Sequence, residues 1–213
     1  MANLLTILRM ILSIIAIEFL FSGRPDLAIT SFFITLIVII LDGLDGYVAR
    51  KHNECSKFGS VFDILGDRVV ENLYWIAFAV LGWVGVWVPM VVAARGIITD
   101  GLRSMALAEG YTAFGESTMM QNKFFHFLTA SRFSRAVYGT AKAIVFLALI
   151  VAYIPNFEYY EPLTINQFLE FSYWQPNLIR FANILVYITV IMCVIRGIPV
   201  IFESKRFISN DKK

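Results

Sequence analysis

The sequence predicts an all-α integral membrane protein with six transmembrane helices, and three observations support this fold class. Of the 213 residues, 58% are hydrophobic and only 16% are charged, whereas soluble domains average about 45–50% and about 25%. The apolar residues form six long segments, and none of them shows the alternation of a barrel strand. Because lipid satisfies no backbone hydrogen bonds, such segments cross a bilayer as helices. A soluble protein of this size would expose large apolar patches, and a disordered chain or a coiled coil is equally disfavoured.

The six expected spans are bounded by turn signals. The first two meet at Gly23 and Pro25, and the third and fourth meet at a tight turn flanked by Gly82 and Gly85. An aromatic-rich stretch from Pro155 to Pro176 separates the fifth and the sixth. Each span is close to the roughly 20 apolar residues that a bilayer requires. We expect the spans at roughly 4–22, 26–47, 60–82, 85–108, 134–154 and 179–202, within a single domain over 1–213.

Residues 109–133 form a polar interruption that is too long for a simple turn. We expect an amphipathic helix on the inner leaflet there or, with equal weight, a mobile loop. The apolar side of such a helix would carry Phe124, Phe125, Phe127 and Leu128.

Lysine and arginine are distributed unequally between the two sets of connections. Ten fall in one set and two in the other, the two being Arg24 and Arg180. Under the positive-inside rule, both termini and the connections 48–59 and 109–133 then face the cytoplasm, and we expect the protein in the inner membrane of the cell. The ten are Arg50, Lys51, Lys57, Lys123, Arg132, Arg135, Lys205, Arg206, Lys212 and Lys213.

Charge and cysteine content narrow the choice of partners. The net charge is +2, which is too small to indicate a nucleic acid partner. The two cysteines, Cys55 and Cys193, lie far apart and indicate neither a zinc site nor a disulfide scaffold. Membrane lipids are the partners that the composition favours.

Four aspartates lie where two expected helices approach the cytoplasmic surface. Asp42 and Asp45 are spaced i,i+3 near the end of the second span, and Asp63 and Asp67 are spaced i,i+4 near the start of the third. Each pair shares one helix face. Since the short connection makes these spans neighbours, we expect the four carboxylates to converge beside a polar cavity that faces the cytoplasm.

Four negative charges in a low-dielectric setting need compensation. Two Mg²⁺ or Mn²⁺ ions would supply it, because carboxylate oxygens are the hard ligands that these ions prefer. A site with two such ions clamps phosphate oxygens and activates an oxygen nucleophile, which indicates phosphoryl-type transfer. The alternative is that one or two of the acids pair with Arg50 or Arg68, or face water. Four acids on adjacent faces, interleaved with glycines, favour the functional site.

Residues 42–67 read D-x2-D-G-x2-A-R-x8-G-x3-D-x3-D without a gap or substitution. This pattern resembles the signature of the CDP-alcohol phosphotransferase family of membrane enzymes, and the six spans with a short N-terminal lead-in also fit that family. The resemblance implies metal ligands at Asp42, Asp45, Asp63 and Asp67, of which Asp67 is also the general base. It further implies a pocket for the CDP-linked lipid that is lined by Gly46, Ala49, Arg50 and Gly59.

The same resemblance implies a reaction and an assembly. An alcohol hydroxyl attacks the β-phosphorus of a CDP-linked lipid, CMP is released and a phosphodiester is left. Two divalent cations would hold the pyrophosphate while Asp67 takes the hydroxyl proton. The resemblance also implies a homodimer.

The fourth and fifth spans carry cations that indicate a phosphorylated acceptor. Arg95 and Arg103 are eight residues apart on one helix face, and Lys142 follows in the next span. Buried guanidinium groups suit a phosphate dianion, although snorkelling or pairing with Asp100 and Glu109 is the structural alternative. The segments ANLLTILRM and AARGIITDGLRSM resemble those of phosphatidylglycerophosphate synthases, which use glycerol 3-phosphate. Inositol phosphate, phosphatidylglycerol and serine remain as alternative acceptors.

Two other classes of membrane protein also use clustered acids. A membrane prenyltransferase binds a diphosphate through Asp-rich motifs and Mg²⁺, but it needs more helices than 213 residues supply and lacks the G-x2-A-R segment. A divalent-cation carrier would use an acidic ring, but the arginines of the fourth span argue against a cation path. Both classes are therefore less favoured than the phosphotransferase.

Overall fold

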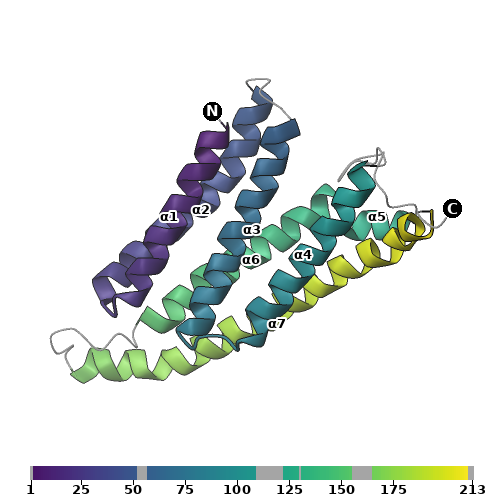
Figure 1. The fold of residues 1–213 in the computed structure, drawn as a ribbon. Helices are drawn as coiled ribbons and strands as arrows, with labels where there is room; N and C mark the ends of the chain where they lie inside the picture. Colours follow the sequence, from purple (N-terminus) through teal and green to yellow (C-terminus); the bar gives the residue numbers. More distant parts are fainter. Residues whose placement is uncertain (1, 52–56, 109–121, 130, 155–164, 211–213) are drawn as a thin grey trace. The chain divides into compact units, whose positions relative to one another are not determined.

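The computed structural model describes residues 2–51, 57–108, 122–129, 131–154 and 165–210, and the elements in these ranges are all helical, which confirms the all-α fold class (Figure 1). The helices are α1 (Ala2–Phe21), α2 (Pro25–Lys51), α3 (Lys57–Val80), α4 (Trp87–Ala108), α5 (Lys123–Thr129), α6 (Arg132–Tyr153) and α7 (Ile165–Asn210).

Four stretches are long and apolar enough to cross a membrane: Asn3–Phe21, Pro25–Gly43, Phe124–Tyr153 and Trp174–Ser204. Helices α3 and α4 have sufficient length, with 24 and 22 residues, but they carry the charged residues discussed below. The composition and these stretches confirm an integral membrane protein. The assignment of α3 and α4 as further spans stays a prediction.

The chain divides into two compact units. The first comprises Met1–Val86 and Ala143–Ile184, and the second comprises Trp87–Lys142 and Leu185–Lys213. Helices α6 and α7 contribute residues to both units. The single domain expected from the sequence stays a prediction.

Helix α7 is much longer than the span expected at 179–202, because it begins at Ile165 and has 46 residues. Pro176, which was expected to end the preceding loop, lies inside this helix. A proline inside a helix removes one backbone donor and crowds the carbonyl one turn earlier, but its φ is near the helical value, so a helix can continue through it with a local distortion. The expected end of the loop at Pro176 was therefore wrong, whereas the apolar stretch Trp174–Ser204 includes the expected span at 179–202.

The expected amphipathic helix in 109–133 is described only from Asn122 onward, where α5 is a single short helix. Phe124 and Phe127 are exposed on α5, whereas Phe125 packs against Ala106 and Val200. Residues 109–121 lie outside the described part of the chain.

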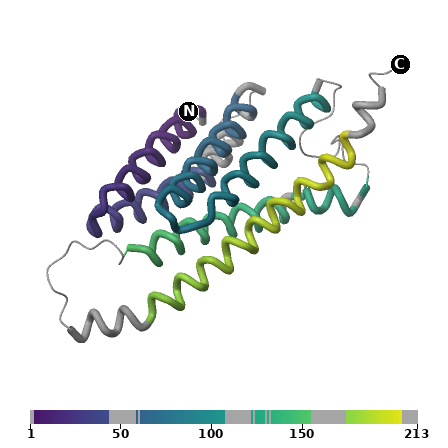
Figure 2. Tube along the Cα trace, turned by 60° about the horizontal axis from the view of Figure 1, so that its bottom comes forward, coloured from purple at the N-terminus to yellow at the C-terminus, as the bar shows by residue number. Residues whose placement is uncertain are grey.

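In the first unit, α1 packs against α2 and α3, and the three helices run side by side in both views (Figures 1 and 2). The hydroxyl of Ser31 on α2 donates a hydrogen bond of 2.7 Å to the carbonyl of Ala16 on α1. The ring of Tyr74 on α3 stacks on Phe146 of α6, with 5.0 Å between centroids. Polar and aromatic contacts thus fix the helices that carry the acids.

Two residues after the end of α3, Gly82 adopts a left-handed backbone conformation, as the turn expected there requires. Gly82 has a φ of 75° and donates to the carbonyl of Ala79, and the N–H of Trp83 reaches the carbonyl of Phe78 at 2.8 Å. These two bonds and the stacked rings of Phe78 and Trp83 form a Schellman cap. The cap satisfies the backbone carbonyls of Phe78 and Ala79 near the end of α3.

Candidate functional site

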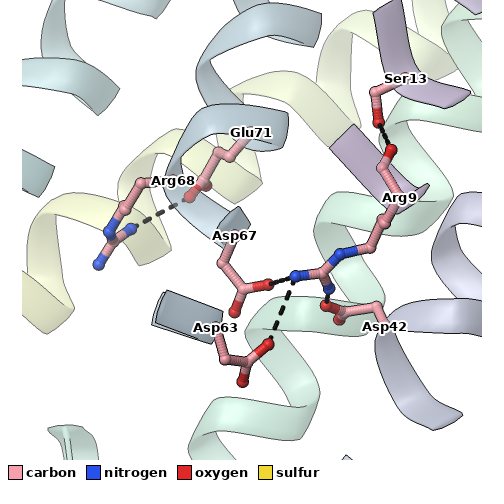
Figure 3. A network of polar contacts seen from close by, with 7 residues as sticks. All are labelled: Arg9, Ser13, Asp42, Asp63, Asp67, Arg68 and Glu71. Atoms are coloured by element: carbon pink, nitrogen blue, oxygen red, sulfur yellow. Dashed lines mark hydrogen bonds and ion pairs between the residues drawn. The ribbon is translucent and has the colours of Figure 1, made fainter. Parts of the chain in front are cut away.

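Three of the four predicted aspartates converge on one guanidinium, that of Arg9 on α1 (Figure 3). Nη1 of Arg9 forms an ion pair with Asp42 from α2. Nη2 lies 2.8 Å from Oδ1 of Asp67 and 3.5 Å from Oδ1 of Asp63, both on α3. Side chains from three helices therefore meet at one point, as the spacing of the acids predicted for α2 and α3.

Arg9 reaches this point because α1 and α3 approach closely at Gly66. A Cβ atom on Gly66 would collide with the methyl of Thr6 and would lie 3.4 Å from Nη2 of Arg9. The hydroxyl of Ser13 donates to the backbone carbonyl of Arg9 at 2.8 Å, one turn along α1. The bare backbone of Gly66 thus leaves the space in which the guanidinium lies beside the acids.

The cation and the acids differ strongly in exposure. The side chain of Arg9 is 2% exposed, whereas those of Asp42, Asp63 and Asp67 are 53%, 44% and 45% exposed. Among these four side chains, three carboxylates against one guanidinium leave two negative charges in excess. The acids therefore keep an open anionic side, and the guanidinium lies at the buried side of the same cluster.

The chemistry of this donor set suits a divalent cation. Carboxylate oxygens from two helices lie within ion-pair distance of one point, and they carry more negative charge than Arg9 neutralises. Within the described residues, no group of three or more acidic, histidine or cysteine side chains is already spaced as a metal site. The side chain of Asp45 lies outside the described part. The residues thus fit the predicted ions by charge and ligand type.

One turn beyond Asp67, α3 carries a second ion pair. Nη1 of Arg68 lies 3.1 Å from a carboxylate oxygen of Glu71, which is buried. The structural alternative considered from the sequence was that one or two of the aspartates pair with Arg50 or Arg68. The structure pairs Arg68 with Glu71, and it places Arg9, which the spacing of the acids did not predict, against Asp42, Asp63 and Asp67.

The residues expected to line the CDP-lipid pocket are described only in part. Gly59 lies in the first turn of α3 and is half-buried. Gly46, Ala49 and Arg50 lie in the last turns of α2, and their side chains fall outside the described residues. Their role stays a prediction.

The second unit contains a basic cluster around the ring of Tyr138 on α6. The cationic groups of Arg95, Lys142 and Arg196 lie 5.8, 5.9 and 5.3 Å from the ring centroid. They come from α4, α6 and α7. The structure thus brings together Arg95 and Lys142, two of the three predicted phosphate ligands, and adds Arg196.

Arg196 is held firmly in this cluster. It is 7% exposed, its Nη1 donates to the hydroxyl of Ser134 at 2.5 Å, and its Nη2 donates to the carbonyl of Thr129 at 3.4 Å. Among the described residues, neither Nε of Arg196 nor Nε of Arg95 has a hydrogen-bond partner, although both atoms are buried. Three cations surround one aromatic ring, and the buried Nε donors of two of them have no hydrogen-bond partner among the described residues. This cluster is therefore suited to bind an anion.

Arg103, the third predicted phosphate ligand, forms an ion pair with Asp100. Its Nη1 lies 3.4 Å from a carboxylate oxygen of Asp100, one turn earlier on α4. This ion pair is the alternative to phosphate binding that was considered for Arg103 from the sequence. The proposed contact of Arg103 with phosphate stays a prediction.

The described residues thus form a helical membrane protein that carries an acidic cluster on α2 and α3 and, in the second unit, a basic cluster around Tyr138. The family model of CDP-alcohol phosphatidyltransferases matches residues 1–195, and the chain belongs to this family. Membership confirms the family resemblance of the 42–67 motif.

Individual relatives match shorter segments. A CDP-diacylglycerol–glycerol-3-phosphate 3-phosphatidyltransferase of Mycoplasma genitalium is 38% identical over 74 residues, which are 35% of this chain and 31% of that protein. A probable phosphatidylglycerophosphate synthase of Mycobacterium tuberculosis is 26% identical over 113 residues, 52% of this chain and 54% of that protein. A CDP-diacylglycerol–inositol 3-phosphatidyltransferase of Arabidopsis thaliana is 36% identical over 67 residues, 32% and 28% of the two chains. The matches thus span about a third to a half of these relatives.

Proposed function

We propose that this protein is an enzyme of phospholipid biosynthesis that transfers the phosphatidyl group of CDP-diacylglycerol to glycerol 3-phosphate. The products would be phosphatidylglycerophosphate and CMP. The observation that carries this proposal is the convergence of Asp42, Asp63 and Asp67, three positions of the family motif, at one point with an open anionic side. Family membership and the names of the Mycoplasma and Mycobacterium relatives support it.

In the proposed reaction, the acceptor hydroxyl oxygen forms a bond to the β-phosphorus, and the bond from that phosphorus to the oxygen of CMP breaks. Asp67 takes the hydroxyl proton. One of its oxygens faces Arg9 and the other points away from it, so the second is available as a base (Figure 3). The electron pair of the broken bond leaves with CMP as negative charge on its phosphate, and the proton of the acceptor hydroxyl stays on Asp67.

Asp42, Asp45, Asp63 and Asp67 are the residues that would hold two divalent cations, Mg²⁺ or Mn²⁺. When bound, such ions would neutralise the charge of the diphosphate and of the departing CMP. Gly46, Ala49, Arg50 and Gly59 would line the pocket for the CDP-linked lipid.

The basic cluster is the proposed site of the acceptor phosphate. Arg95, Lys142 and Arg196 surround one aromatic ring, and two of them have buried Nε donors available among the described residues. A phosphate dianion would satisfy these donors and offset the repulsion between the cations. Arg103 is the fourth candidate ligand.

We further propose that the protein lies in the inner membrane, with both termini and the active site in the cytoplasm, and that it forms a homodimer. The imbalance of lysine and arginine supports the orientation. The dimer is supported by resemblance to the family alone. Labelling of single cysteines with an impermeant reagent, and mass determination in detergent, test these two statements.

The decisive experiment is a panel of acceptors. Purified protein receives CDP-diacylglycerol, Mn²⁺ and one of glycerol 3-phosphate, inositol phosphate, inositol, serine or phosphatidylglycerol, and released CMP is measured. We expect release with glycerol 3-phosphate. No release with any acceptor would contradict the proposed enzyme activity.

Inositol or its phosphate is the second candidate acceptor. The Arabidopsis relative is named as an inositol 3-phosphatidyltransferase. The three cations around Tyr138 favour a phosphorylated acceptor over inositol itself. Faster CMP release with inositol phosphate than with glycerol 3-phosphate would assign that acceptor instead.

A further inference from the structure

The acidic cluster is bridged by a cation from the protein itself. Arg9 contacts Asp42 through Nη1 and contacts Asp63 and Asp67 through Nη2. In all three carboxylates, the atom that faces Arg9 is Oδ1. A guanidinium can hold several carboxylates in this way because it is planar, carries five N–H donors and stays protonated.

The guanidinium lies where the carboxylates converge, which is also where a divalent cation would gain the most ligands. Arg9 is 2% exposed, and its acidic partners are 44% to 53% exposed. A metal ion would reach the acids from their open side, while Arg9 holds them from the buried side. The two cations would compete for the same negative charge and would repel each other.

We propose that Arg9 is a competing counter-cation of the metal site. It holds Asp42, Asp63 and Asp67 together in the metal-free protein, and it gives up part of these ion pairs when divalent cations bind. This inference rests on the proposed function, because it takes the three acids as metal ligands. Arg9 thereby stabilises the empty site and lowers its affinity for metal.

Two opposite effects follow from removing the charge of Arg9. The metal-free protein loses stability, because three clustered carboxylates then lack the guanidinium that bridges them. Metal binding becomes tighter, because no cation has to be displaced. A residue with only a packing role would lower stability without raising the affinity for metal.

The experiment measures Mn²⁺ binding to the full chain in detergent micelles, without substrate, from the electron paramagnetic resonance signal of free Mn²⁺. We expect Arg9→Gln to bind Mn²⁺ about tenfold more tightly than the unchanged protein, given the strength of a unit charge a few ångströms away. Arg9→Lys keeps the charge but bridges fewer carboxylates, so its affinity should rise by a smaller factor. Asp63→Asn should bind more weakly.

Arg24→Gln is the matched control. Arg24 also forms an ion pair with an aspartate, Asp26 at 2.7 Å, but it is 61% exposed and follows the opposite end of α1. Its substitution should leave Mn²⁺ affinity unchanged. A parallel thermal melt should show that Arg9→Gln lowers the Tm without metal and that Mn²⁺ raises it by more than in the unchanged protein.

The outcomes separate the two proposals. Mn²⁺ affinity that is equal or weaker in Arg9→Gln, with Asp63→Asn impaired, would overturn the role of Arg9 and leave the metal site in place. If no protein of the series bound Mn²⁺, the metal-dependent function would be overturned as well. If Arg9→Gln did not fold, unchanged or weaker affinity in Arg9→Lys would overturn the role of Arg9.

Discussion

Gly66 on α3 lies so close to Thr6 on α1 that a single added methyl group on Gly66 would overlap the Thr6 methyl. This contact brings α1, and with it Arg9, against the acids of α3. The position immediately precedes Asp67. A glycine between two of the predicted metal ligands therefore serves helix packing as well as access to the site.

Gly66→Ala should destabilise the protein. Overpacking a helix contact costs about 1–3 kcal/mol, and we expect a lower Tm and weaker Mn²⁺-dependent activity. Thr6→Ser removes the opposing methyl and should restore much of the loss in the double variant. Gly101→Ala is the control, since a Cβ there meets open space. A Tm for Gly66→Ala equal to that of the control would contradict the close contact.

Asp67→Asn should abolish turnover while Mn²⁺-dependent binding of the CDP-linked lipid remains measurable. The amide cannot take the hydroxyl proton, and loss of a general base typically costs about 10²–10⁴-fold in rate. CMP release and equilibrium binding of the lipid substrate are the two measurements. Asp26→Asn, which changes an aspartate in the first turn of α2 that pairs with Arg24, is the matched control. Full turnover in Asp67→Asn would show that Asp67 is not the general base.

Arg196→Gln should raise the KM for glycerol 3-phosphate by about tenfold or more, because charge-assisted hydrogen bonds to phosphate are among the strong ones. The KM for CDP-diacylglycerol should change much less. Arg103→Ala is expected to act in the same direction. Arg180→Gln, on an exposed position of the same helix as Arg196, is the control. If a variant raised the KM for both substrates equally, its arginine would not be a specific ligand of the acceptor phosphate.

Tyr138→Leu should lower the Tm more than Tyr138→Phe does. The Leu variant loses the ring that faces three cations, and each such contact contributes about 0.5–2 kcal/mol, whereas Phe keeps the ring. Inorganic phosphate should recover part of the lost Tm by offsetting the repulsion among the cations. Identical melts for the two variants would show that the ring does not stabilise the basic cluster.

Periodicity and motif spacing predicted most of the helices and the convergence of the described aspartates. The apolar segments predicted the ends of α1 to α4 and of α6 to within a few residues, and Gly82 predicted the turn after α3. The i,i+4 spacing of Asp63 and Asp67 placed them on one face. These features depend on residues that are close together in the sequence, so they can be predicted from the sequence alone.

Contacts between distant helices were not predictable in the same way. Arg9 and Arg196 each interrupt an apolar segment, which marks them as functional candidates in a membrane helix. Their partners, however, come from tertiary packing: Asp67 lies on another helix, and Ser134 is 62 residues from Arg196. The start of α7 was predicted wrongly because a proline usually lies at or before the start of a helix, whereas Pro176 lies within α7.

The exposure of the acids has a consequence for inhibitor design. A molecule that approaches Asp42, Asp63 and Asp67 from solvent meets carboxylates, since Arg9 is hidden beneath them. If the acids bind the nucleotide as proposed, anionic mimics of it would be repelled there unless metal ions accompany them. Compounds with an amidine or polyamine head would instead be drawn to this surface, and they offer a starting point distinct from substrate analogues.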